Sequence, residues 1–77
     1  MINNIIEKIT NSLKNLNIDT NNTDTDFILE NNLDSITFIH IILNIEEAFS
    51  ILIPDEYLLM EKLNTVSKIA NLVEELC

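Results

Sequence analysis

The sequence contains no glycine, no arginine and no tryptophan, and it has only one proline and one cysteine in 77 residues. Because tight β-hairpin turns favour glycine or Asn-Gly at positive φ, a chain without glycine is more typical of helices than of sheets. The one cysteine, Cys77, has no second cysteine to pair with, so no oxidising compartment is implied. A chain of this length buries one modest core. This predicts a single domain over residues 1–77 and leaves little room for the enclosed pocket of an enzyme.

The charge is one-sided, with four lysines against 13 acidic residues and a formal net charge of −9. This balance disfavours nucleic acids and anionic membrane surfaces and favours partners with basic docking surfaces. Hydrophobic residues make up 47%, which is too much for a disordered acidic tail. The most apolar stretch, residues 36–45, contains a histidine and an asparagine and is far too short for a membrane span. With no targeting segment visible, we expect a monomeric cytoplasmic protein.

Apolar residues recur every three or four positions in three segments, which is the pattern of amphipathic helices. The first segment covers residues 2–16, and Asn4 and Glu7 near its start have the spacing of a capping box. Residues 17–26 are polar and rich in turn-forming side chains, so they predict a long surface loop. The apolar residues within 27–33 are expected to pin the far end of that loop to the core.

Capping residues and the proline place the remaining helices. Asp34 is a strong N-cap for a helix from Ser35 to about Phe49, and Thr65 is the predicted N-cap of the last helix. Residues 50–54 form a break that ends at the proline, and residues 55–63 predict a short helix. The predicted fold is therefore all-α, a small four-helix bundle with three main helices, one short helix and a long loop after the first helix.

The helix predicted from residue 35 has two apolar faces. At about 100° per residue, one arc forms a core stripe of Phe38, Ile41, Ile42, Ile45 and Phe49. A neighbouring arc is shared by Ser35, Ile36, Ile39, Leu43, Glu46 and Glu47. The second arc is either buried in the bundle as well or exposed as a docking patch rimmed by acids, and the helical geometry leaves both open.

Residue types alone favour a structural role for Ser35. Serine is common in the first turn of helices, where its hydroxyl satisfies backbone groups. His40 is the only histidine and lies on a different side of the helix, so the sequence predicts no nucleophilic triad around Ser35.

Four segments of the sequence change that interpretation. The run Leu33-Asp34-Ser35-Ile36 resembles the attachment site of acyl and peptidyl carrier proteins, which has an Asp-Ser-Leu/Ile pattern. Residues 45–49 (Ile-Glu-Glu-Ala-Phe), 53–56 (Ile-Pro-Asp-Glu) and 65–66 (Thr-Val) resemble three further motifs of that family. An Asp-Ser pair alone is not specific, but four motifs in register are, and the predicted helices agree with the family over nearly the full chain.

The resemblance implies that Ser35 carries a covalent 4′-phosphopantetheine arm, and that Asp34 caps the helix and takes part in recognition by the transferase. It implies no enzyme activity, no catalytic residue and no metal, because partner enzymes act on the acyl, aminoacyl or peptidyl thioester that the arm holds. The implied partners are a phosphopantetheinyl transferase, an adenylating enzyme that loads the arm, and condensing or transferring enzymes of nonribosomal peptide, polyketide or fatty acid biosynthesis. The implied partner-binding surface consists of Ile36, Ile39, Leu43, Glu46 and Glu47.

Three departures from fatty-acid-type carriers bear on the subtype. Asn31 and Asn32 stand where the family often has glycine, and asparagine tolerates left-handed backbone better than most residues. The stretch from 54 to 65 is longer than in fatty-acid carriers and, with Tyr57 and Leu58, is more similar to free-standing peptidyl or D-alanyl carriers. His40 stands where fatty-acid carriers usually have an acid.

Two alternatives to a carrier remain open. Asp19, Asn21, Thr23 and Glu30 occupy the first, third, fifth and twelfth places of a helix-loop-helix calcium loop, although the sixth place, which needs glycine, holds Asp24. The other alternative is a helical interaction module without a prosthetic group.

Overall fold

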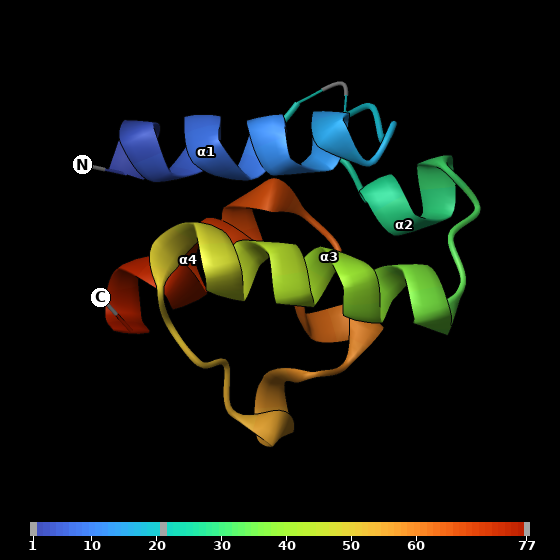
Figure 1. Ribbon diagram of the computed structural model, residues 1–77. Coiled ribbons are helices and arrows are strands. Elements are labelled where there is room, and N and C mark those ends of the chain that lie inside the picture. The colour runs from blue at the N-terminus through green and yellow to red at the C-terminus, as the bar shows by residue number, and fades with distance from the viewer. Residues whose placement is uncertain (1, 21, 77) are drawn as a thin grey trace.

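The computed structural model describes residues 2–20 and 22–76, together with the side chains of these residues apart from that of Ile2 (Figure 1). The predictions that fell on Asn21 and Cys77 therefore lie outside the described residues. Four α-helices follow one another along the chain, α1 (Ile2–Asn15), α2 (Phe27–Glu30), α3 (Ser35–Phe49) and α4 (Val66–Leu76). Two 3-10 turns, η1 (Asp55–Tyr57) and η2 (Met60–Lys62), precede α4. With no strand in the described ranges, the predicted all-α fold with three main helices is confirmed.

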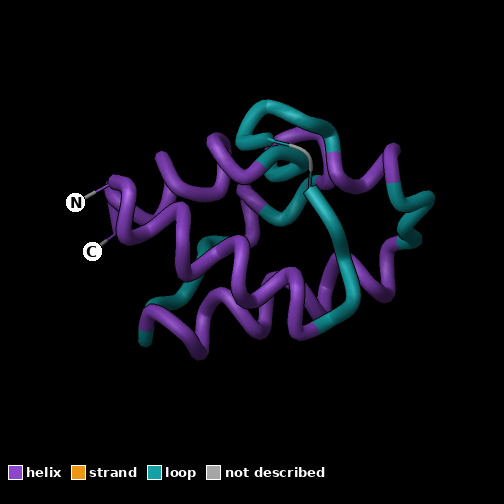
Figure 2. Tube along the Cα trace, turned by 90° about the horizontal axis from the view of Figure 1, so that it is seen from above, coloured by secondary structure: helices purple, strands orange, loops and turns teal. Residues whose placement is uncertain are grey.

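The three long helices pack around one another. Helix α1 contacts both α4 and α3, and the chain between α3 and α4 loops away below α3 in Figure 1. The start of α1 and the end of α4 lie at the same end of the molecule, as Figure 2 shows from above. Within the described residues, none of the helices combines the length and apolar character needed to cross a membrane.

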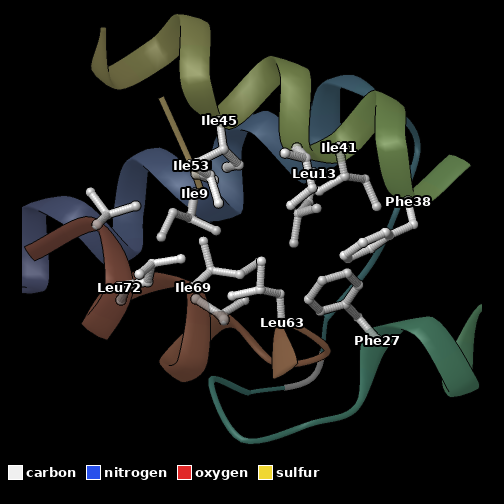
Figure 3. Close-up of a cluster of buried hydrophobic side chains, with 14 of the residues drawn as sticks. Ile9, Leu13, Phe27, Phe38, Ile41, Ile45, Ile53, Leu63, Ile69 and Leu72 are labelled. Carbon is white, nitrogen blue, oxygen red and sulfur yellow. The ribbon is translucent and has the colours of Figure 1, made fainter. Parts of the chain in front are cut away.

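One core fills the space between the helices (Figure 3). The predicted stripe of α3 faces inward, since Phe38, Ile41, Ile42 and Ile45 are at most 3% exposed. Figure 3 shows Phe38 and Phe27 pointing toward one another at one end of the core. The other buried apolar side chains come from α1, the loop after it, α4 and the segments just before η1 and just after η2. They are Ile9, Leu13, Ile18, Ile53, Leu63, Val66, Ile69, Ala70, Leu72 and Val73.

The last member of the predicted stripe, Phe49, is only half-buried. The ammonium group of Lys8 lies 5.0 Å from the centre of its ring and donates a hydrogen bond to the main-chain oxygen of Ala48 at 3.3 Å. The end of α3 is thus held to α1 by a cation-π contact and a hydrogen bond instead of full burial.

The predicted surface loop after α1 is anchored at several points to the start of α4. The Asn64 amide donates to a carboxylate oxygen of Asp26 at 2.8 Å, and the Ser67 hydroxyl donates to Asp24 at 3.1 Å. The main-chain N–H of Ser67 donates to the oxygen of Thr23 at 2.9 Å. The polar groups of the loop therefore form their hydrogen bonds with residues 64 and 67, although the loop itself has no regular secondary structure.

Three local predictions differ from the structure. Among the apolar residues within 27–33 that were expected to pin the loop to the core, Leu29 is 77% exposed. Helix α1 begins at Ile2, so Asn4 lies inside its first turn and cannot be the N-cap of the predicted capping box. The short helix predicted over 55–63 is instead the pair η1 and η2, separated by Leu59 in an extended conformation. Two features explain why no continuous helix forms here. Neither 3-10 turn has a side-chain cap, and the apolar residues from Tyr57 to Met60 are consecutive, so they do not form one apolar face of a helix.

The two faces of α3 should respond differently to the same substitution. Ile45 is fully buried and Ile39 is 43% exposed on the same helix. Ile45→Ala should cost about 2–5 kcal/mol of unfolding free energy because it leaves a cavity in the core. Ile39→Ala should cost no more than about 1 kcal/mol, as is usual for surface positions. Urea unfolding followed by circular dichroism measures both, and equal costs would show that both arcs are core.

Candidate functional site

Ser35 is the first residue of α3, and its side chain is exposed. The residue before it, Asp34, has extended backbone and is the N-cap, because its carboxylate accepts a hydrogen bond from the N–H of Thr37 at 2.9 Å. The predicted cap and the predicted start of this helix are therefore confirmed. The cap fixes the point at which the chain enters the helix, and with it the position of the Ser35 hydroxyl.

The turn before Asp34 explains how the chain manages without glycine. Asn32 has a φ of 53° and ends helix α2 in the left-handed conformation. Its N–H donates to the oxygen of Leu29, and the N–H of Leu33 donates to the oxygen of Ile28 at 2.9 Å. These two bonds are those of a Schellman motif. Asn32 thus stands where the carrier family that the sequence resembles often has glycine, and the half-buried Leu33 packs on the core directly before Asp34.

The N-terminal end of α3 suits an anion. The first turn of a helix carries N–H groups without an intrahelical partner and the positive end of the helix dipole. A phosphodiester on the Ser35 oxygen would face these groups, which favours the charged group at this place. Because Ser35 is exposed, a group attached to its oxygen would start at the surface of the protein.

The second arc of α3 is largely exposed, so it is not buried in the bundle as a second core face. Ile36 is 67% exposed, Ile39 43% and Leu43 55%. Glu47 is exposed as well, whereas Glu46 is half-buried. The structure therefore brings Ser35 and an apolar surface with an acidic edge together on one side of one helix.

A groove beside this surface was not predicted from the sequence. It has a volume of about 510 Å³ and runs between α3 and the chain after this helix. Leu52, which is 84% exposed, lies on the side of the groove opposite α3. The sequence feature that could have indicated this groove is Leu52, an apolar residue in the break between α3 and Pro54. Because the break is not helical, spacing rules do not tell whether such a residue is buried or exposed. The lining residues are Ile39, Ile42, Leu43, Glu46, Leu52, Ile53, Pro54, Asp55 and Leu58.

The calcium loop gains no support from the described part of it. The carboxylates of Asp24 and Asp26 already accept hydrogen bonds from α4 and from the residue before its cap. The amide of Asn31 donates to the main-chain oxygen of Asp19 at 2.9 Å. No group of three or more histidine, cysteine, aspartate or glutamate residues within 2–20 and 22–76 is placed to hold a metal ion.

The pKa of Asp34 should show whether its carboxylate accepts the capping hydrogen bond from Thr37. The N–H of Thr37, followed by the Thr37 hydroxyl, lowers the pKa of Asp34 below its ordinary value of 3.8, and the charge of His40 acts in the same direction. Because the pKa is lowered in the folded state, the cap stabilises the fold fully above this ordinary value. Its contribution is lost as the pH falls through the folded pKa.

An NMR titration of the Asp34 carboxyl carbon measures this pKa, and the Thr37 amide proton should shift with the same midpoint. Asp34→Asn is the control, since it keeps an oxygen for the Thr37 N–H but has no proton to gain. A midpoint at or above 3.8 would contradict the capping bond in solution.

The comparison with protein families agrees with this geometry. A family model described as a phosphopantetheine attachment site matches residues 5–73, from the first helix to the last. No curated protein and no solved structure matches the chain. Proteins with this domain receive 4′-phosphopantetheine from a phosphopantetheinyl transferase and serve biosynthetic enzymes without being catalysts themselves. The chain therefore belongs to the family of phosphopantetheine-binding carrier proteins, and it is a carrier of covalently attached 4′-phosphopantetheine rather than an enzyme.

Proposed function

We propose that Ser35 is the residue to which 4′-phosphopantetheine is attached. The observation that carries this proposal is the exposed Ser35 side chain at the first residue of α3, directly after the capping Asp34. The family match gives the chemistry, and the Leu33-Asp34-Ser35-Ile36 motif gives the position. Asp34 is proposed to serve twice, as the cap of α3 and as part of what the transferase recognises.

The residues present fit the prosthetic group. When bound, it supplies a thiol that holds the cargo as a thioester. The N-terminal turn of α3 would hold the root of the arm through the N–H groups that the Asp34 cap leaves unused and through the helix dipole. Phe27 and Phe38, both at most 2% exposed, pack in the core near the start of α3 and so stabilise the position of this turn. Residues 1–77 are accordingly proposed to form one carrier domain around this single core.

The exposed face of α3 is the proposed partner-binding surface. It begins beside Ser35, so an enzyme bound there would have the arm within reach. Its centre is apolar, and the net charge of the chain is −9, which favours partners with basic docking surfaces. Electrostatic attraction of this kind speeds encounter without tight binding, so one carrier can pass between several enzymes. The proposed residues are Ile36, Ile39, Leu43, Glu46 and Glu47.

The proposed cargo is an acyl, aminoacyl or peptidyl group, loaded by an adenylating enzyme and taken up by condensing or transferring enzymes. A peptidyl or D-alanyl subtype is supported by the similarity of residues 54–65 to those carriers and by His40, which stands where fatty-acid carriers usually have an acid. His40 is exposed on α3 and able to face a partner.

Attachment at Ser35 is tested by incubating the apo protein with a phosphopantetheinyl transferase and coenzyme A and measuring the intact mass. Wild type should gain the mass of the arm, and Ser35→Ala should gain none while remaining helical by circular dichroism. Ser50→Gly is the matched control, because it removes an exposed hydroxyl at the other end of α3 from a residue with a φ of 55°. A mass gain in Ser35→Ala, or none in wild type, would refute the assignment.

The docking surface is tested by the rate of the same reaction. Leu43→Ala should lower kcat/KM of the transferase about tenfold, as for residues at the centre of an interface. Glu47→Lys should slow the reaction most at low salt, because it weakens electrostatic steering. Glu74→Lys makes the same change of charge at an exposed position of α4 and should have a much smaller effect. Equal effects of the two charge reversals would mean that net charge matters and the α3 face does not.

A further inference from the structure

Glu46 differs from the other residues of the proposed partner-binding surface. Its side chain is half-buried, and one of its carboxylate oxygens accepts a hydrogen bond from the main-chain N–H of Ile53 at 2.7 Å. Glu47, its neighbour in the sequence, is exposed. We infer that Glu46 is a positioning residue, which holds residues 51–54 against α3 and so builds the second wall of the docking groove. The inference rests on the proposed function only for the statement that partners use this groove.

Glu46 accepts several hydrogen bonds from the residues that follow the end of α3. Its main-chain oxygen accepts from the N–H of Ser50 and, at 3.1 Å, from the N–H of Ile51. Ser50 adopts the left-handed conformation, which turns the chain out of the helix. The carboxylate then takes the N–H of Ile53, so one residue fixes three positions of the segment after α3.

The hydrogen bond from Ile53 to Glu46 satisfies an N–H group in a buried residue. Ile53 is 5% exposed, and a buried N–H without an acceptor is costly. The next residue, Pro54, has no N–H to donate and leads into η1. The carboxylate of Glu46 is therefore the last acceptor that ties this segment to α3 before the 3-10 turns begin.

Holding Ile53 also determines where Leu52 points. Exposure alternates along the segment, with Ile51 half-buried, Leu52 84% exposed and Ile53 buried. With its two neighbours packed on the core, Leu52 is held out toward solvent. It lies on the far side of the groove from Leu43, so the groove has one apolar wall from α3 and one from the segment that Glu46 holds.

The two neighbouring glutamates, Glu46 and Glu47, thus have different roles toward a partner. Glu47 offers a charge on the surface, where it can steer a basic partner. Glu46 offers an acceptor that shapes the apolar groove, and a carboxylate makes a shorter and stronger bond to an N–H than a neutral group does. Glutamine has an acceptor oxygen at the same distance from the helix without the charge, so it separates the two roles.

The hydrogen bond is tested by amide hydrogen exchange of the apo protein, followed by NMR, with no partner present. In Glu46→Ala the Ile53 amide should exchange at least about tenfold faster than in wild type, the effect of losing one hydrogen bond. In Glu46→Gln and in the control Glu47→Ala, the rate should stay within about threefold of wild type, since both keep an acceptor for Ile53. The inference is overturned if Glu46→Gln exchanges as fast as Glu46→Ala, or if Glu46→Ala exchanges no faster than wild type.

The consequence for docking is tested by arm attachment with a phosphopantetheinyl transferase and coenzyme A. Glu46→Ala should react about tenfold more slowly than Glu46→Gln, whereas Glu47→Ala and Glu47→Gln should react alike. Leu52→Ala should react more slowly than wild type although its Ile53 amide exchanges at the wild-type rate. If Glu46→Gln is as slow as Glu46→Ala, the charge of Glu46 matters for docking and its positioning role does not. If wild type gains no mass, the proposed function fails, and hydrogen exchange still decides whether Glu46 holds the segment.

Discussion

Everything on the functional side of this molecule depends on the burial of one face of α3. Phe38, Ile41 and Ile45 are at most 2% exposed, and they pack in the core that α3 shares with α1 and α4. Because helical residues three and four apart share a face, this burial also decides which residues are turned outward. The outward positions of Ile36 and of Ser35 at the start of the helix therefore depend on the buried side chains of the opposite face.

The two ends of α3 are made rigid without glycine. Asn32 has a φ of 53° before the helix and Ser50 has a φ of 55° after it, a conformation that glycine adopts at no steric cost. At the first end a Schellman motif places Leu33 on the core and leads into the capping Asp34. At the second end the N–H of Ile51 donates to the main-chain oxygen of Glu46, which corresponds to the bond from Leu33 to Ile28 at the first end. The local hydrogen bonds offset the strain, so the site keeps its geometry where the usual residue is missing.

The parts of the fold that local sequence rules describe were predictable. The N-cap at Asp34 and the span of α3 follow from one residue type and from helical spacing, and the hydroxyl of Thr65 accepts the N–H of Lys68 as its predicted cap role requires. The same rules leave other features open. They do not tell a 3-10 turn from a helix over residues 55–63, because both suit a short mixed segment. Nor do they reveal the bond between Glu46 and Ile53, which joins the chain across a turn.

The placement of the lysines bears on how partners read the surface. None of the four lysines lies between residues 15 and 61 of the sequence. Lys8, Lys62 and Lys68 instead donate to the main-chain oxygens of residues 48, 56 and 61, where they hold helix ends and turns together. These three lysines thus stabilise the fold, and α3 has no lysine of its own to offset Glu46 and Glu47. On the proposed function, an enzyme with a basic surface would be drawn toward the helix that carries Ser35, and the small apolar centre of that helix would keep the contact weak enough to be released.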